Sequence, residues 1–191
     1  MGNDIYESGK LCRYGKIPGL EKTVSRMVFG TAIGPMIEGK NADELLDAAF
    51  AKGINTFDTA RGYGRAEESL GGWMKRRDNR EQVVVISKCG NCDSDGSVCV
   101  NRKVIETELA ESLQALQTDY IDIYLLHRDD PKTPVSEMID ALNELQKEGK
   151  IKVFGVSNWA HERIEEANRY AKEHQLQGFS VSSPHFGLAE Q

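Results

Sequence analysis

The stretch QVVVIS, residues 82–87, has an unbroken apolar centre and leads directly into Lys88. A strand with one solvated face alternates apolar and polar residues, whereas a strand that is covered on both faces is apolar throughout. The segment 102–116 follows, and its apolar residues recur at the spacing of one helix face. They are Ile105, Leu109, Leu113 and Leu116. A doubly covered strand followed by an amphipathic helix predicts a right-handed βαβ unit in a parallel sheet.

The same alternation extends in both directions along the chain. Further strands are predicted at 26–30, 54–58, 121–125 and 152–156, with a sixth beginning near 179–181. Further helices are predicted at 42–52, 66–76, 135–148 and 162–174. The strands end near residues 30, 58, 87, 125, 156 and 182, and this even spacing favours a barrel, with a doubly wound sheet as the alternative. We therefore predict an α/β fold of the (β/α)8 TIM-barrel type, incomplete at about six parallel strands, in a single domain over residues 1–191.

Composition and charge narrow the functional classes. The chain has 191 residues, with 30 acidic against 24 basic side chains and a formal net charge of −6. Such a balance gives no overall basic field for nucleic acid or an acidic membrane surface, so neither is an expected partner. No apolar run approaches the ~20 residues that cross a bilayer. The first ten residues, MGNDIYESGK, do not resemble a signal peptide, so a cytoplasmic location is expected.

Polar residues follow the predicted strands at one position after another. In a barrel, the loops at the carboxyl ends of the strands carry the chemistry. Each of these residues alone has a structural explanation, such as a turn cap, a solvated strand end or a satisfied buried histidine. Their arrival at one end of one architecture instead indicates a site. The strand-end residues are Gly30, Thr31, Asp58, Lys88, His127, Ser157 and Asn158.

Four of the side chains near these strand ends could carry out proton transfer. A free tyrosine titrates near pH 10, too high to exchange a proton easily at neutral pH. A nearby ammonium favours the phenolate, and a carboxylate keeps that ammonium charged and in place. Tyr63, Lys88 and Asp58 could form this relay, while His127 would donate a hydrogen bond to a carbonyl oxygen. The reducing equivalent would then come from a cofactor.

Three motifs in order resemble those of the aldo-keto reductase family. They are DTARGYGRAEESLGGWM (58–74), LQTDYIDIYLLHRDDP (116–131) and IKVFGVSNW (151–159), and the resemblance runs from about residue 28 to the end of the chain. It implies a catalytic tetrad of Asp58, Tyr63, Lys88 and His127, with Tyr63 as the general acid that reduces an aldehyde or ketone. It also implies an NADP (NADPH) cofactor, or NAD, whose carboxamide Ser157 and Asn158 would hold. The residues expected on the cofactor side are Gly30, Thr31, Asp58, Ser157, Asn158, Ser183 and Phe186.

Two departures from the family pattern are visible. Where the family often has a glutamine and an aromatic residue three positions later, this chain has Ser183 and Phe186. The ring of Phe186 could still stack on the nicotinamide, but the glutamine contact would be changed. The chain also stops at Gln191, whereas a complete barrel needs roughly 250 residues.

The shortness of the chain carries further expectations. We expect the last barrel units to be missing, and with them the family's segment for the pyrophosphate and 2′-phosphate of the cofactor. No GxGxxG loop replaces that segment. Two open sheet edges would invite self-association. The chain by itself is therefore expected to bind cofactor poorly.

The cysteines and the alternative functions remain to be weighed. Cys89, Cys92 and Cys99 lie within eleven residues and could supply metal ligands, but a second ligand pair is missing, so free thiols and no metal are expected. One alternative is a truncated, catalytically inactive relative of the reductases that acts as a binding or regulatory protein. Another is a metal-dependent lyase on a similar barrel, for which Asp58 and His127 alone are too few ligands.

Overall fold

A six-stranded parallel sheet forms the centre of the protein. The computed structural model describes residues 12–91 and 98–185. The strands are β3 (Val28–Gly30), β4 (Thr56–Asp58), β5 (Val84–Cys89), β6 (Ile121–Leu126), β7 (Ile151–Ser157) and β8 (Val181–Ser183). Every strand is parallel to its neighbours, and their order across the sheet is their order along the chain. In a doubly wound sheet the strand order reverses part-way along the chain, so that not all consecutive strands are neighbours. The strand order here runs in one direction throughout, which confirms the prediction of an incomplete barrel.

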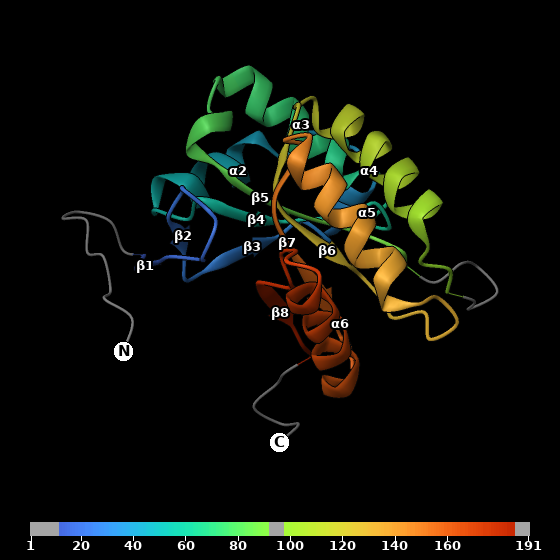
Figure 1. Cartoon of the computed structure of the whole chain (residues 1–191). Helices are drawn as coiled ribbons and strands as arrows, with labels where there is room; N and C mark the ends of the chain where they lie inside the picture. The colour runs from blue at the N-terminus through green and yellow to red at the C-terminus, as the bar shows by residue number, and fades with distance from the viewer. Residues whose placement is uncertain (1–11, 92–97, 186–191) are drawn as a thin grey trace.

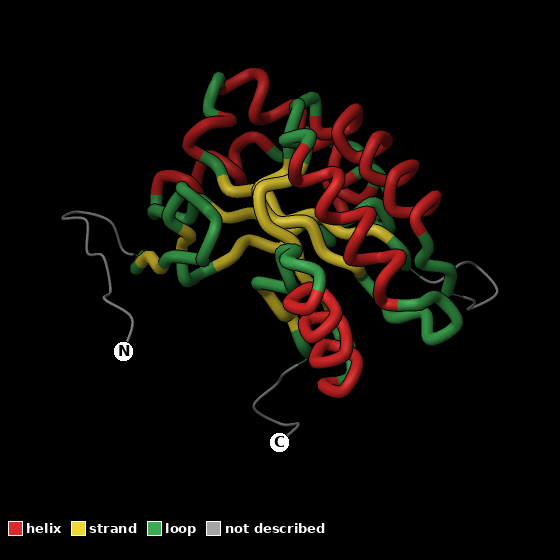
Figure 2. Tube along the Cα trace, viewed as in Figure 1, coloured by secondary structure: helices red, strands yellow, loops and turns green. Residues whose placement is uncertain are grey.

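The helices cover one side of the curved sheet, as Figures 1 and 2 show. They are α2 (Asp43–Ala51), α3 (Ala66–Arg77), α4 (Arg102–Leu116), α5 (Val135–Lys147) and α6 (His161–Glu173), each within a few residues of its predicted bounds. Helix α4 begins with a true cap, because the side chain of Asn101 accepts a hydrogen bond from the amide of Val104. Among the described residues, no helix combines the length and apolar content that crossing a membrane would require.

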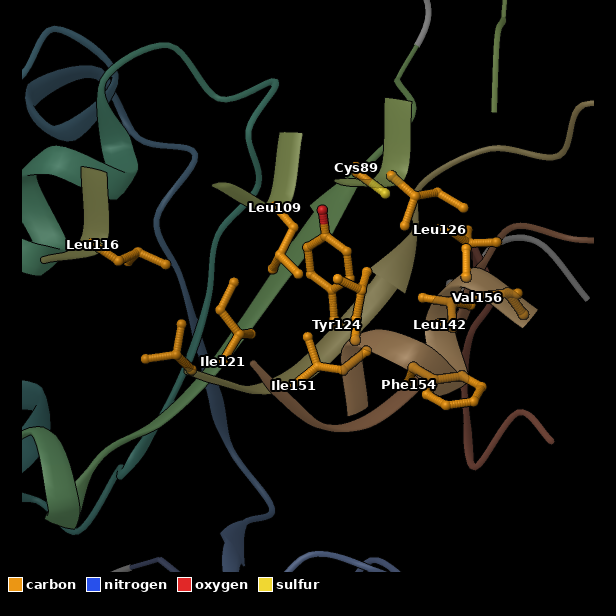
Figure 3. Close-up of a cluster of buried hydrophobic side chains, with 14 of the residues drawn as sticks. Cys89, Leu109, Leu116, Ile121, Tyr124, Leu126, Leu142, Ile151, Phe154 and Val156 are labelled. Atoms are coloured by element: carbon orange, nitrogen blue, oxygen red, sulfur yellow. The ribbon is translucent and has the colours of Figure 1, made fainter. Parts of the chain in front are cut away.

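The larger apolar core lies between the sheet and these helices. Figure 3 shows its central part, in which side chains of β5, β6 and β7 meet those of α4 and α5. The residues labelled there are Cys89, Leu109, Leu116, Ile121, Tyr124, Leu126, Leu142, Ile151, Phe154 and Val156. Apolar residues on the opposite, inner face of the same strands, among them Val84, Ile123 and Val153, form a second and smaller cluster, the inner cluster. Both faces of the central strands are thus covered, which explains the unbroken apolar run at residues 83–86, most of it in β5.

A short antiparallel hairpin, which was not predicted, covers the inner face of the sheet. It pairs β1 (Tyr14–Gly15) with β2 (Val24–Ser25), and the turn between them places Leu20 in the inner cluster. The turn also carries Lys22, whose Nζ lies 3.1 Å from Oδ1 of the buried Asp122. The hairpin is therefore tied to the sheet by apolar packing and by an ion pair.

Two glycines are needed where backbones approach closely. A Cβ at Gly155 of β7 would lie 1.9 Å from the carbonyl oxygen of Val181 in β8. A Cβ at Gly71 of α3 would lie 2.5 Å from the backbone carbon of Leu116 at the end of α4. In both places the neighbouring atom is backbone and cannot move aside alone, so a larger residue would push whole elements apart.

Candidate active site

A lysine ammonium joins two other predicted residues, Asp58 and Tyr63, near the carboxyl ends of β4 and β5. Nζ of Lys88 lies 2.7 Å from Oδ1 of Asp58, 2.9 Å from the carbonyl oxygen of Thr59 and 3.2 Å from the hydroxyl of Tyr63. The Lys88 side chain is 4% exposed and that of Asp58 is 26% exposed. Lys88 was expected just after its strand but is its second-last residue, so the β5 backbone holds it. The carboxylate, the ammonium and the phenol thus form one connected group.

The loop that carries Tyr63 is fixed by hydrogen bonds to β5. The amide of Thr59 donates to the carbonyl of Ile86 at 2.8 Å, and that of Arg61 donates to the carbonyl of Lys88 at 3.1 Å. Within the loop, the amide of Tyr63 donates to the carbonyl of Ala60 at 3.0 Å. The loop therefore continues the pairing of β4 with β5 beyond the strand and delivers the phenol to the ammonium.

His127 completes the group at the end of β6. Its backbone amide donates to the carbonyl of Cys89 at 2.7 Å, and its ring meets the ring of Tyr63 edge-on, with centroids 5.7 Å apart. Burial, together with the positive charges of Lys88 and Arg128, lowers the pKa of His127 to about 4. The imidazole is therefore neutral at pH 7 and can donate one N–H. Its Nδ1 is buried and has no hydrogen-bond partner among the described residues.

Ser157 and Asn158 lie at the end of β7, next to β8. Ser157 was expected after its strand but is its last residue. Its Oγ donates to the carbonyl of Ser183 at 3.2 Å and accepts from Nδ2 of Asn158 at 3.0 Å. Asn158 has a φ of +57°, a left-handed conformation that asparagine tolerates better than most residues. Ser183 thus contributes its backbone carbonyl to this contact, and Phe186 lies outside the described residues.

Gly30 and Thr31 lie on the other side of the tetrad, at the end of β3. The amide of Thr31 donates to the carbonyl of Asp58 at 2.9 Å. Its Oγ1 is buried and has no hydrogen-bond partner within the described segments. A Cβ at Gly30 would meet nothing within 4 Å, so this strand end borders open space. The described residues of the predicted site, from β3 to β8, therefore lie along the edge formed by the carboxyl ends of the strands.

A polar cavity of about 730 Å³ is lined mostly by residues of α3 and α4 and by none of the tetrad. Arg61, Glu67 and Glu111 are among its lining residues. Glu67 is buried, and this burial raises the pKa of its carboxyl group. Its Oε1 accepts a hydrogen bond of 2.6 Å from Oγ of Ser87. Because Ser87 and Lys88 are consecutive in β5, their side chains face opposite sides of the sheet. Glu67 therefore anchors α3 on the helix side.

The cysteines show no metal-binding arrangement in the part of the chain that the structure describes. Residues 12–91 and 98–185 contain no group of three or more potential ligands. Cys89 is buried, which raises the pKa of its thiol to about 12, and a thiol in that state is unreactive at neutral pH. Cys99 is exposed, and Cys92 lies outside the described residues.

Comparison with known proteins assigns the class that this fold and site define. The family described as the Aldo/keto reductase family matches residues 26–190. The chain therefore belongs to the aldo-keto reductase family.

Individual relatives are similar over most of this chain. Aldo-keto reductase YhdN of Bacillus subtilis is 36% identical over 162 residues, which are 80% of this chain and 49% of the relative. Norsolorinic acid reductase B of Dothistroma septosporum is 35% identical over 153 residues, 74% of this chain and 39% of the relative. A protein of Oryza sativa subsp. japonica named "Probable voltage-gated potassium channel subunit beta" is 35% identical over 86% of this chain and 52% of its own length. The chain thus spans about half the length of the curated relatives it matches, or less.

Proposed function

We propose that this chain carries the proton-transfer half of a nicotinamide-dependent carbonyl reductase, in which Tyr63 is the general acid. The observation that supports it is the contact of one buried ammonium with both a carboxylate and a phenol, at 2.7 and 3.2 Å. An ion pair that only stabilises the fold would not require a phenol in contact with its ammonium. The names of two relatives, which contain the word reductase, agree with this proposal.

The residues of the chain would divide the work as follows. Tyr63 transfers its hydroxyl proton to the carbonyl oxygen of an aldehyde or ketone, which becomes the alcohol oxygen. The ammonium of Lys88 offsets the negative charge left on the phenolate, and Asp58 keeps that ammonium in place. His127, neutral at pH 7, donates an N–H to the same carbonyl oxygen and so orients the substrate. In the reverse direction the phenolate takes the proton back.

The strand ends on both sides of the tetrad suit the nicotinamide end of the cofactor, NADPH or NADH. Asn158 offers an amide for the carboxamide, and the buried Oγ1 of Thr31 lacks a partner among the described residues. The open space at Gly30 leaves room for a ring or sugar. When bound, the cofactor supplies the hydride that the carbonyl carbon accepts. Ser157 and the backbone of Ser183 would hold Asn158 in position.

Turnover by Tyr63→Phe tests the acid role. The variant keeps the ring that packs edge-on against His127 and loses only the hydroxyl. We expect NADPH-dependent reduction of a simple aldehyde to fall at least 100-fold, with the cofactor dissociation constant changed less than threefold. Tyr14→Phe is the matched control, because the Tyr14 hydroxyl binds the carbonyl of Gly53, away from the tetrad. Equal turnover by Tyr63→Phe and the wild-type chain would remove Tyr63 from the acid role.

A second candidate function is that of a regulatory subunit that catalyses no reaction. The name of the rice relative, a probable channel subunit, is the observation that suggests it. The complete tetrad favours the reductase, because a purely structural scaffold needs no connected proton donor. Fluorescence titration with NADPH separates the two together with the turnover assay, since Trp159 follows Asn158 directly. Binding with aldehyde-dependent oxidation supports the reductase, whereas binding without oxidation supports the regulatory subunit.

A further inference from the structure

The guanidinium of Arg163 occupies a junction between two strand-end loops. Arg163 lies in the first turn of α6, and its side chain is 19% exposed. Its Nε lies 3.1 Å from Oδ2 of Asp129, and its Nη2 lies 3.0 Å from the carbonyl of Thr133 and 3.4 Å from that of Asp130. Its Nη1 lies 3.1 Å from Oε2 of Glu166. Three of these four acceptors belong to the loop between β6 and α5, which starts at His127.

That loop is held from its other side as well. Oδ2 of Asp130 accepts hydrogen bonds from the amide of Val100 and from the hydroxyl of Thr133, both at 3.2 Å. Asp130 and Thr133 are buried. The loop that starts at His127 is therefore fixed on the α4 side by Asp130 and on the α6 side by Arg163.

Arg163 also contacts the residue that follows the proposed carboxamide pair. Its guanidinium carbon lies 5.6 Å from the centroid of the Trp159 ring, a cation–π distance. Trp159 is buried and packs edge-on against Phe179, with ring centroids 5.5 Å apart. Since Asn158 directly precedes Trp159, one side chain connects the loop of His127 with the end of β7.

We propose that Arg163 is a positioning residue that fixes the loop of His127 relative to Asn158 at the end of β7. The contacts of Arg163 described above are all with residues of the chain itself. Its catalytic consequence rests on the proposed reductase function, in which His127 orients the carbonyl and Asn158 orients the nicotinamide. A small change in the relative position of the two would lower the rate while leaving binding of each partner almost unchanged.

The first test measures the surroundings of His127 at the start of the loop and does not depend on enzymatic activity. Burial and the nearby positive charges of Lys88 and Arg128 lower the pKa of His127 to about 4, and the ring of Tyr63 packs edge-on against its ring. NMR titration of His127 is compared in the wild-type chain, Arg163→Gln and Asp129→Asn, with Arg169→Gln as the control, since Arg169 is an exposed arginine of the same helix.

The two variants separate loop movement from simple charge effects. Losing the positive charge of Arg163 would raise the His127 pKa, whereas losing the negative charge of Asp129 would lower it. Loosening of the loop exposes the ring to water in both variants. We expect the His127 pKa to rise by about one unit in both, towards its ordinary value of about 6.5. No change, or shifts in opposite directions, would overturn the proposal.

The second test uses turnover in the same proteins. We expect Arg163→Gln to lower kcat between about 10- and 100-fold, with KM values for NADPH and aldehyde within threefold and Arg169→Gln unchanged. An active wild-type chain whose kcat survives Arg163→Gln would contradict the positioning role. If the wild-type chain reduces no aldehyde but the two variants show the expected shifts of the His127 pKa, the proposed function is wrong and the structural role of Arg163 is supported.

Discussion

The contact between Asp58 and Lys88 provides a prediction whose size follows from burial. The change is Asp58→Asn, which keeps the shape of the side chain and removes its charge. The ammonium of Lys88, 4% exposed, then loses its carboxylate partner and is left with neutral oxygen acceptors, among them the carbonyl of Thr59 and the hydroxyl of Tyr63 at 2.9 and 3.2 Å. A buried charge that loses its counter-charge is strongly destabilising.

The expected loss of unfolding free energy in Asp58→Asn is smaller than for a fully buried ion pair. Removing one partner of a buried ion pair costs about 3–5 kcal/mol. Here the Asp58 side chain is 26% exposed, so water screens part of the attraction, and neutral oxygen acceptors remain at the ammonium. We therefore expect Asp58→Asn to lower the free energy of unfolding by about 2–3 kcal/mol. Combining it with Lys88→Met should recover at least about 1 kcal/mol, since no uncompensated ammonium is left.

Urea unfolding followed by tryptophan fluorescence measures all four proteins of this cycle. The emission of the buried Trp73 and Trp159 reports on the core. Strictly additive effects of the two substitutions would refute the argument, because they would mean that the pair is not coupled. A loss below about 0.5 kcal/mol for Asp58→Asn would do the same, since it is typical of an exposed ion pair.

Three further predictions concern packing, pH and the sheet edges. Gly71→Ala should cost about 1–3 kcal/mol in urea unfolding because its methyl group meets the backbone of Leu116, whereas Gly72→Ala, which meets only the flexible end of Arg76, should cost nothing. The folded pKa of His127, about 4 against 6.5, is depressed, so its contribution to stability is complete above pH 6.5 and is lost as the pH falls towards 4. The wild-type chain should therefore lose roughly 2–3 kcal/mol more than His127→Gln between pH 7 and 4, and parallel stability curves would contradict this. Finally, β3 and β8 each have one strand neighbour among the described strands, so the 191-residue chain should self-associate in sedimentation experiments, and a monodisperse monomer at tens of micromolar would count against it.

The central strands and the placing of Asp58, Lys88 and His127 at their carboxyl ends could be predicted because the signals are local. Val84 faces the inner cluster while Val83 and Val85 belong to the core under the helices, so burial on both faces leaves an unbroken apolar run. Asp58 and His127 stand out as polar residues at the ends of such runs. Once the strands are parallel, these ends must meet at the same edge of the sheet.

Other features have no local signal. The hairpin strands are two residues each, too short for any periodicity, and they are held by contacts such as that of Lys22 with Asp122. The contact of Arg163 with Asp129 joins residues 34 positions apart, and either one alone reads as an ordinary charged surface residue. Likewise, nothing in the side chain of Ser183 indicates that its backbone carbonyl holds Ser157.

The most direct test of the central claim follows hydride and proton delivery in a single turnover. The chain is mixed with an aldehyde and a saturating concentration of NADPH that carries deuterium at both hydrogen positions of C4 of the nicotinamide, and the alcohol is analysed by mass spectrometry. If Asp58, Lys88, Tyr63 and His127 form a working reductase site, the wild-type chain yields alcohol with one deuterium on carbon, and Tyr63→Phe yields at least 100-fold less. If the wild-type chain binds the cofactor but forms no deuterated alcohol, the connected tetrad is not sufficient for catalysis and the reductase proposal for this chain is wrong.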